Sequence, residues 1–177
     1  MKRYYCTRSE PEQNFIRPGY GFVPKYNSRL WTVVGSSVAV TLYDARLKLG
    51  GMAHFTRPRR GPGVRASTWF AAPAILWLLR QMMSNGSRIL DLEAQLFGGA
   101  AQIGHPEYSN HIHKENVRIG MELLRDKGVR IETLDVGGHR GRKVLFHSQT
   151  GESVVQRVDH IREADWYPQL AYGAAGS

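Results

Sequence analysis

Short apolar runs and two amphipathic stretches divide the chain into expected strands and helices. Helical spacing is clearest over residues 112–127, where Val117, Met121 and Leu124 recur at i, i+4 and i+7, and a second helix is expected from Pro73 to Met83. Strands are expected over residues 30–34 and 38–43, which are rich in β-branched residues, and over residues 49–55, 89–97, 129–136, 142–147 and 153–158. This order predicts an α+β fold with mixed or antiparallel β layers and two main helices packed on the outside.

Turn-forming residues mark the connections between these elements. Residues 35–37 predict a tight turn between the first two strands, and residues 137–143 and 149–152 predict hairpin turns. The first thirty residues are polar and show no sustained period. We therefore expect an N-terminal basic extension over 1–29, one domain over 30–160, and a C-terminal tail over 161–177.

The composition is that of a globular protein. The chain has 177 residues, of which 42% are hydrophobic and 22% charged, which suits one domain with a real core.

The apolar run 70–79 contains Pro73 and is followed by Arg80, so it is too short to span a membrane. No apolar segment precedes Glu10, so no secretory signal is expected. A single cysteine, Cys6, fits a reducing compartment, and we expect a cytoplasmic location.

Positive charge exceeds negative charge, with a net charge of +9. Arg57, Arg59, Arg60 and Arg65 follow one another with no acid among them. Such an excess suits an acidic protein face, nucleic acid or anionic lipid, although a solvated basic surface explains it equally well. No helix-turn-helix, RNP or zinc-finger pattern accompanies the charge, so nucleic acid is a secondary alternative.

Candidate chemistry is concentrated at two places. The turn Gly35-Ser36-Ser37 can present a side-chain hydroxyl together with backbone N–H groups, which is the local geometry of a nucleophile beside an oxyanion hole. An ordinary structural turn has the same composition. His54 lies on an expected strand among apolar residues, where it is either a general base that reaches the turn or a buried structural histidine.

Two further patterns are weaker. The glycines at 137 and 138 resemble a phosphate-binding loop, but a strand rather than a helix is expected after them. His105, His111 and His113 suggest a metal site, yet no acid or cysteine stands at ligand spacing. We expect no metal and no cofactor.

Several of these strings together resemble one known family, the chemoreceptor glutamine deamidases, CheD. The matching strings, in the family's order, are residues 35–44 (GSSVAVTLYD), 50–55 (GGMAHF), 92–100 (LEAQLFGGA), 112–116 (IHKEN), 135–144 (DVGGHRGRKV) and 150–152 (TGE). The resemblance covers about residues 30 to 158.

The resemblance implies a site with three departures from the family. Family members use a cysteine thiolate, a histidine and a threonine, and the cysteine and histidine positions fall on Ser37 and His54. The threonine position, six residues before the nucleophile, falls on Trp31, which would leave Thr32 on the opposite face of its strand. The family's Tyr-x-Asp falls on residues 70–72, Phe-Ala-Ala, without an aspartate.

The function implied is hydrolysis of glutamine side chains to glutamate on methyl-accepting chemotaxis receptors through an acyl-enzyme. Ser37 would be the nucleophile, His54 the general base and acid, and the N–H groups of Ser36 and Ser37 the oxyanion hole. A CheC-type phosphatase is a further implied partner.

Serine is far less acidic than cysteine, so Ser37 predicts impaired activity. The alternative is a catalytically inactive CheD-like adaptor that binds chemoreceptors or a CheC-type phosphatase.

The origin of Ser37 has two explanations, an engineered Cys→Ser change or natural divergence. The altered threonine and aspartate positions favour divergence, because an engineered trap would leave both intact.

Overall fold

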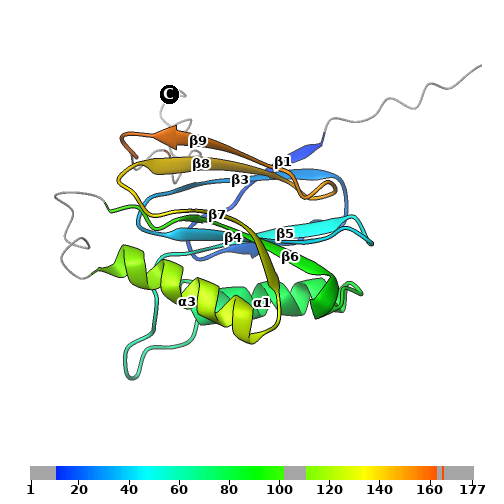
Figure 1. Ribbon diagram of the computed structural model, residues 1–177, viewed down its shortest axis with the longest axis horizontal. Helices are drawn as coiled ribbons and strands as arrows, with labels where there is room; N and C mark the ends of the chain where they lie inside the picture. The colour runs from blue at the N-terminus through cyan, green and yellow to red at the C-terminus, as the bar shows by residue number, and fades with distance from the viewer. Residues whose placement is uncertain (1–10, 102–110, 163–164, 166–177) are drawn as a thin grey trace, which may run out of the picture.

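The chain folds into two stacked β-sheets with a pair of helices on one side (Figure 1). The computed structural model describes residues 11–101, 111–162 and 165. Both helices, α1 (Ala71–Ser84) and α3 (Ile112–Asp126), cover the outer face of one sheet. These layers confirm the expected α+β class with helices packed against sheets.

The two sheets have mixed strand directions. The four-stranded sheet has the order β1 (Glu12–Phe15), β3 (Ser28–Val34), β8 (Gly141–His147), β9 (Ser153–Val158). The five-stranded sheet has the order β2 (Gly21–Phe22), β5 (Leu49–Phe55), β4 (Val38–Asp44), β6 (Leu92–Gly98), β7 (Arg130–Val136). A short 3-10 helix at Ile89–Asp91 precedes β6, where the sequence predicted a continuous strand from residue 89.

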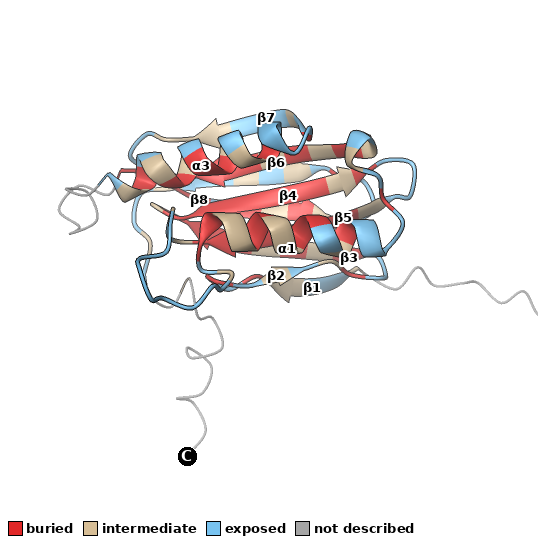
Figure 2. Ribbon diagram, turned by 90° about the horizontal axis from the view of Figure 1, so that it is seen from below, coloured by how far each residue is buried: buried red, intermediate tan, exposed pale blue. Residues whose placement is uncertain are grey.

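Two apolar layers hold the elements together, and Figure 2 shows buried residues on α1, α3 and β4. The larger lies between the helices and the five-stranded sheet, and the smaller lies between the two sheets. Strand β5 serves both, because alternate side chains point to opposite faces. Ala53 and Phe55 pack under the helices, whereas Met52 packs between the sheets, and His54 shares the face of Met52.

The turns at 35–37 and 137–140 are not hairpins. Strands β3 and β4 belong to different sheets, as do β7 and β8, so each turn carries the chain from one sheet to the other. The tight turn predicted at 35–37 is present, whereas the hairpin predicted over 137–143 was wrong, because glycine-rich turns suit a hairpin and a layer crossing equally well. The hairpin at 149–152 is confirmed by the antiparallel pairing of β8 with β9.

The N-terminal segment takes part in both sheets. Strand β1 pairs in parallel with β3, β2 pairs with β5, and Ile16 is buried between the sheets. Residues 11–29 therefore belong to the folded layers, although their polar sequence suggested an extension outside them. Cys6, His105 and most of the expected C-terminal tail lie outside the described residues.

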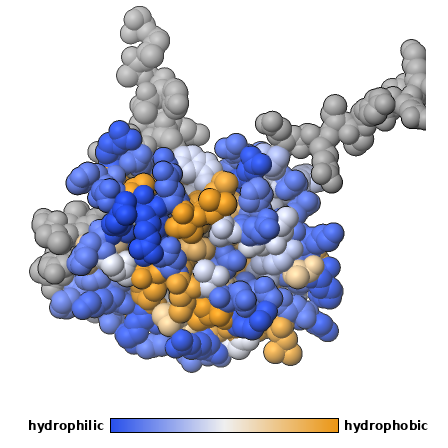
Figure 3. All heavy atoms as spheres, turned by 45° about the horizontal axis from the view of Figure 1, so that its top comes forward, coloured by the Kyte–Doolittle hydropathy of each residue, from blue (hydrophilic) through white to orange (hydrophobic). Residues whose placement is uncertain are grey.

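The outer face of the four-stranded sheet carries an apolar row. Strand register aligns Phe15, Trp31, Leu145 and Val154 across the four strands, and the rings of Phe15 and Trp31 lie 4.4 Å apart. Apolar atoms gather among hydrophilic ones on this side of the molecule (Figure 3). Trp31 therefore faces away from the space between the sheets.

Candidate active site

Three polar side chains meet in the space between the two sheets. Ser37 comes from the turn between β3 and β4, His54 from β5, and Thr32 from β3. The Nε2 atom of His54 lies 2.8 Å from Oγ of Ser37, and its Nδ1 atom lies 2.9 Å from Oγ1 of Thr32. The sequence placed Ser37 and His54 together, and this expected proximity is confirmed.

The hydrogen bonds in this group have one consistent direction. Thr32 Oγ1 lies 2.7 Å from the carbonyl oxygen of Ile16, which can only accept, so the threonine hydroxyl donates there. Oγ1 is then left to accept from Nδ1–H of His54. The neutral ring consequently carries no hydrogen on Nε2, which can accept the hydroxyl hydrogen of Ser37. This is the tautomer that a general base toward Ser37 needs.

Burial determines the acidity of the histidine. His54 is completely buried, and this desolvation lowers its pKa to about 4, while hydrogen bonding to the Ile16 carbonyl opposes the shift in part. The imidazole is therefore neutral at physiological pH. Ser37 is 5% exposed, so the serine end of the group is the one that reaches the surface.

Thr32, not Trp31, occupies the position beside the histidine. Leu30, Thr32 and Val34 alternate onto the inner face of β3 and are all buried, whereas Trp31 stacks on Phe15 outside. The expectation that Thr32 faces away was wrong by one residue of strand register, and a shift of one residue exchanges the two faces. A threonine hydroxyl thus lies beside His54, five residues before Ser37, where the family's pattern has the threonine six residues before the nucleophile.

The N-terminal segment also fixes the backbone of His54. The carbonyl of His54 accepts from the N–H of Gly19 at 2.8 Å, and its N–H donates to the carbonyl of Tyr20 at 2.9 Å. Together with the Ile16 carbonyl, these contacts show that residues 16–20 hold the histidine strand and the threonine in register.

All three carbonyls of the turn that carries Ser37 accept hydrogen bonds. The Gly35 oxygen accepts from Ala100 N–H at 2.8 Å, and the Ser37 oxygen accepts from Gly99 N–H at 2.8 Å. The Ser36 oxygen accepts from Nδ2 of Asn116 on α3 at 3.0 Å. In a trans peptide the N–H points opposite to the carbonyl, so these bonds set the directions of the N–H groups of Ser36 and Ser37.

The two glycines at the end of β6 permit this close approach. A Cβ on Gly98 would lie 2.2 Å from the Ser37 oxygen, and one on Gly99 would lie 2.2 Å from the Val117 side chain. Both have positive φ angles, 117° and 63°. Side chains at either position would displace the segment that binds the nucleophile turn.

The sequence did not identify two residues that position the site. Asn116 is fully buried, and its Nδ2 donates to Thr56 O as well as to Ser36 O, so one amide links α3 to the turn and to the end of β5. Arg142 is 1% exposed and binds Asp135 and the Gly137 carbonyl, which fixes the second crossing between the sheets. Both lie in the family-like strings; the partners of Asn116 are 80 and 60 residues away in sequence, whereas those of Arg142 are 7 and 5 residues away.

The other candidate residues do not converge on a site. The rings of His111 and His113 lie 6.3 Å apart, and within the described ranges no three potential ligands among histidine, cysteine, aspartate and glutamate form a metal-binding group. Phe70 and Ala71, at the position of the Tyr-x-Asp pattern, are buried at the start of α1.

Comparison with known proteins shows the family. The model of the family described as CheD chemotactic sensory transduction matches residues 56–157. A probable chemoreceptor glutamine deamidase CheD 1 of Anaeromyxobacter dehalogenans (strain 2CP-C) is 33% identical over 146 residues, which is 82% of this chain and 85% of that protein. The corresponding CheD of Xanthomonas euvesicatoria pv. vesicatoria (strain 85-10) is 33% identical over 165 residues, 93% of this chain and 83% of that protein.

The chain belongs to the CheD family. A match of 165 residues within a chain of 177 must include the stretch that holds Thr32, Ser37 and His54, although the family-model match begins after it. In the part of the chain that the structure describes, no helix is long and apolar enough to cross a membrane.

Proposed function

We propose that this protein hydrolyses glutamine side chains to glutamate on methyl-accepting chemotaxis receptors, with Ser37 as nucleophile. The observation that carries the proposal is the directed hydrogen-bond chain from Ser37 through His54 and Thr32 to the Ile16 carbonyl. The relatives named as probable chemoreceptor glutamine deamidases supply the substrate class.

The reaction follows from the direction of this chain. Ser37 Oγ attacks the side-chain amide carbon of glutamine while Nε2 of His54 takes the hydroxyl proton. The N–H groups of Ser36 and Ser37 bind the resulting oxyanion. His54 then returns the proton to the amide nitrogen, ammonia leaves, and an ester links Ser37 to the substrate. Water attacks this ester with His54 again as base, which releases glutamate and restores the serine hydroxyl.

The same geometry predicts slow turnover. A serine hydroxyl is a weak acid and needs an imidazole whose protonated form is stabilised. Here the buried ring has a pKa lowered to about 4, and its Nδ1–H faces a neutral threonine rather than a carboxylate. The imidazolium formed during attack is therefore costly, and we infer that the enzyme is impaired relative to a cysteine-based one.

A second candidate function rests on this same observation. A site that is organised but weakly basic could bind receptor glutamines without hydrolysing them, as an adaptor for chemoreceptors or a CheC-type phosphatase. Both functions place the protein in the cytoplasm, where receptors present their signalling regions.

We also infer that the functional domain begins before residue 30, because Ile16 and Gly19 bind the site.

Site-resolved mass spectrometry of a receptor cytoplasmic fragment distinguishes the two. The enzyme reading predicts slow conversion of glutamine to glutamate that disappears in Ser37→Ala. Binding of the fragment without any Ser37-dependent conversion would support the adaptor and contradict the enzyme.

A further inference from the structure

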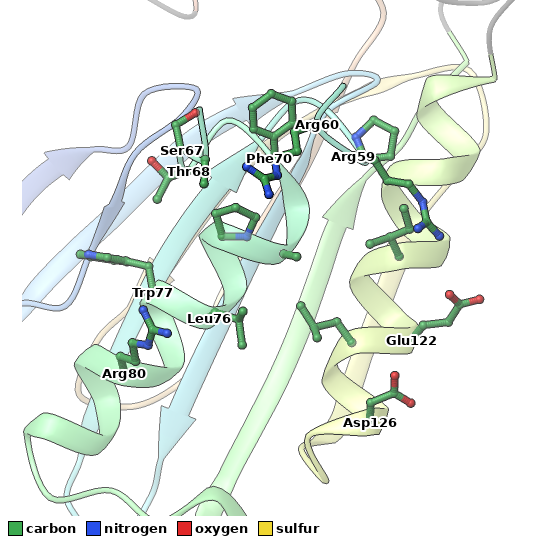
Figure 4. A pocket seen from close by; sticks show the side chains of 16 residues that line it. Arg59, Arg60, Ser67, Thr68, Phe70, Leu76, Trp77, Arg80, Glu122 and Asp126 are labelled. Carbon is green, nitrogen blue, oxygen red and sulfur yellow. The ribbon is translucent and has the colours of Figure 1, made fainter. Parts of the chain in front are cut away.

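A long groove runs between α1 and α3 on the helical side of the molecule (Figure 4). Its volume is about 850 Å³. Apolar side chains from both helices form its floor, namely Phe70, Pro73, Leu76, Trp77, Ile119 and Leu123. Neither Ser37 nor His54 lines this groove, so it is separate from the site described above.

The rims of the groove carry opposite charges. Arg80 projects from α1, and Arg59 and Arg60 come from the loop that follows β5, whereas Glu122 and Asp126 come from α3 (Figure 4). Glu122 is already bound by Arg118 at 2.7 Å. Positive charge therefore predominates along the rim formed by α1 and the loop.

The three groove arginines differ from most others in having no carboxylate partner. Within the described residues, no carboxylate lies within 4.0 Å of Arg59, Arg60 or Arg80, and Arg60 donates only to the Val64 carbonyl. Glu115 is bound by Arg118, whose hydrogen bonds are the main cause of the lowered pKa of this carboxyl, whereas Arg59 lowers it only weakly. Glu115 is therefore not available to the three groove arginines. The arginines that do have such partners are Arg46, Arg88, Arg118, Arg130, Arg140, Arg142, Arg157 and Arg162.

We propose that this groove binds an amphipathic α-helix of a partner protein, with an apolar stripe on the floor and a row of acidic side chains against Arg59, Arg60 and Arg80. An open channel between two helices suits a third helix, which contacts it through residues at i, i+3, i+4 and i+7. Helix α1 has 14 residues and is about 21 Å long, which about four turns of a partner helix would match. An acidic flank would supply the carboxylates that the rim lacks.

The groove is connected to the nucleophile turn. Arg59 and Arg60 lie a few residues after Thr56, whose carbonyl shares the Asn116 amide with Ser36. A helix in the groove would thus lie against the loop whose base is tied to the turn that carries Ser37. Under the proposed function this helix belongs to the substrate, but binding itself needs no activity from Ser37.

The test measures binding in Ser37→Ala, so that failure of catalysis does not affect it. The probe is a fluorescein-labelled synthetic helix of about 18 residues with a leucine stripe, glutamates on one flank and glutamines elsewhere. A twin peptide with lysines in place of the glutamates is the control. Fluorescence anisotropy gives both dissociation constants at low salt and at about 150 mM salt, where the Debye length is about 8 Å.

Two sets of charge variants make the test specific. The triple variant Arg59→Gln, Arg60→Gln, Arg80→Gln should weaken binding of the acidic peptide about tenfold or more. The matched control Arg65→Gln, Arg125→Gln, Lys127→Gln removes the same charge from exposed positions outside the groove and should change binding less than about twofold. Leu76→Asp should also weaken binding, because it places a charge on the apolar floor.

Equal losses in the two triple variants would overturn the proposal, as would equal binding of the acidic and lysine peptides. Tighter binding of duplex DNA than of the acidic peptide, lost in both triple variants alike, would instead assign the basic excess to nucleic acid. Peptide binding to the groove without any glutamine conversion by the wild-type protein would leave the docking surface standing and remove only the enzymatic function.

Discussion

Thr32 accepts a hydrogen bond from the ring of His54, with 2.9 Å between Oγ1 and Nδ1. The hydroxyl of Thr32 in turn donates a hydrogen bond to the carbonyl of Ile16. The threonine thereby selects the histidine tautomer that leaves Nε2 free of hydrogen toward Ser37. A histidine and a threonine hydroxyl are thus joined as the expected Cys-His-Thr set requires, with serine at the nucleophile position.

The variant Ser37→Cys should deamidate a receptor fragment much faster than the wild type, by about a hundredfold or more, because a thiol needs far less help from its base. Trp31 does not crowd the threonine position, since its ring packs on Phe15 on the outer face. Initial rates of ammonia release measure the gain. A Ser37→Cys protein no faster than the wild type would show that another part of the site is defective.

The variant Thr32→Val should lower kcat about ten- to hundredfold in the Ser37→Cys background, because the ring loses the acceptor that orients it. Thr32→Ser keeps the hydroxyl and should retain most of the activity. Steady-state kinetics separate kcat from KM, and KM should change little. Equal losses in the two variants would mean that the hydroxyl is not what matters at this position.

Asn116→Leu should lower kcat about tenfold or more with little change in KM, because the Ser36 carbonyl loses the donor that sets the direction of Ser37 N–H. The control is Leu124→Ala, which removes a buried side chain from the same helix away from the turn and should cost about 2–5 kcal/mol of stability. Comparable loss of kcat in this control at matched folded fraction would assign the Asn116 effect to stability alone.

The sequence predicted the strands that carry the site because they are short, largely apolar runs bounded by turn residues, as in 49–55, where every residue after Leu49 is buried, His54 included. It also predicted the meeting of Ser37 and His54 through the family's spacing. It misassigned Thr32 because the family's six-residue spacing pointed to Trp31, whereas pairing with β8 and the contact with Ile16 decide which residue of β3 faces inward.

Other parts of the structure had no local signal at all. Strands β1 and β2 have 4 and 2 residues, too few to show a period, although residues 16–20 bind His54 and Thr32. Asn116 shares a face of α3 with the buried Ile119 and Leu124, but nothing local indicates that its partners are Ser36 and Thr56. Layer crossings at 35–37 and 137–140 depend on long-range pairing.

Stability should fall as the pH is lowered from about 6.5 to about 4. The pKa of His54 is about 4 in the folded protein, below its ordinary value of 6.5, so the unfolded chain binds the proton first. The contribution of this histidine is fully present above pH 6.5 and amounts to about 3 kcal/mol that is lost by pH 4. Urea unfolding at several pH values measures it, and His54→Gln should flatten this part of the profile. An unchanged profile in that variant would show that other groups cause the acid sensitivity.

The proposed function requires that Ser37 itself performs amide hydrolysis. Its test is to incubate a receptor cytoplasmic fragment with the wild-type protein in water enriched in ¹⁸O and then to map glutamine positions by mass spectrometry. We expect slow, site-specific formation of ¹⁸O-labelled glutamate that is absent with Ser37→Ala. Conversion at the same rate with Ser37→Ala, or no conversion above that of the fragment alone, would contradict it.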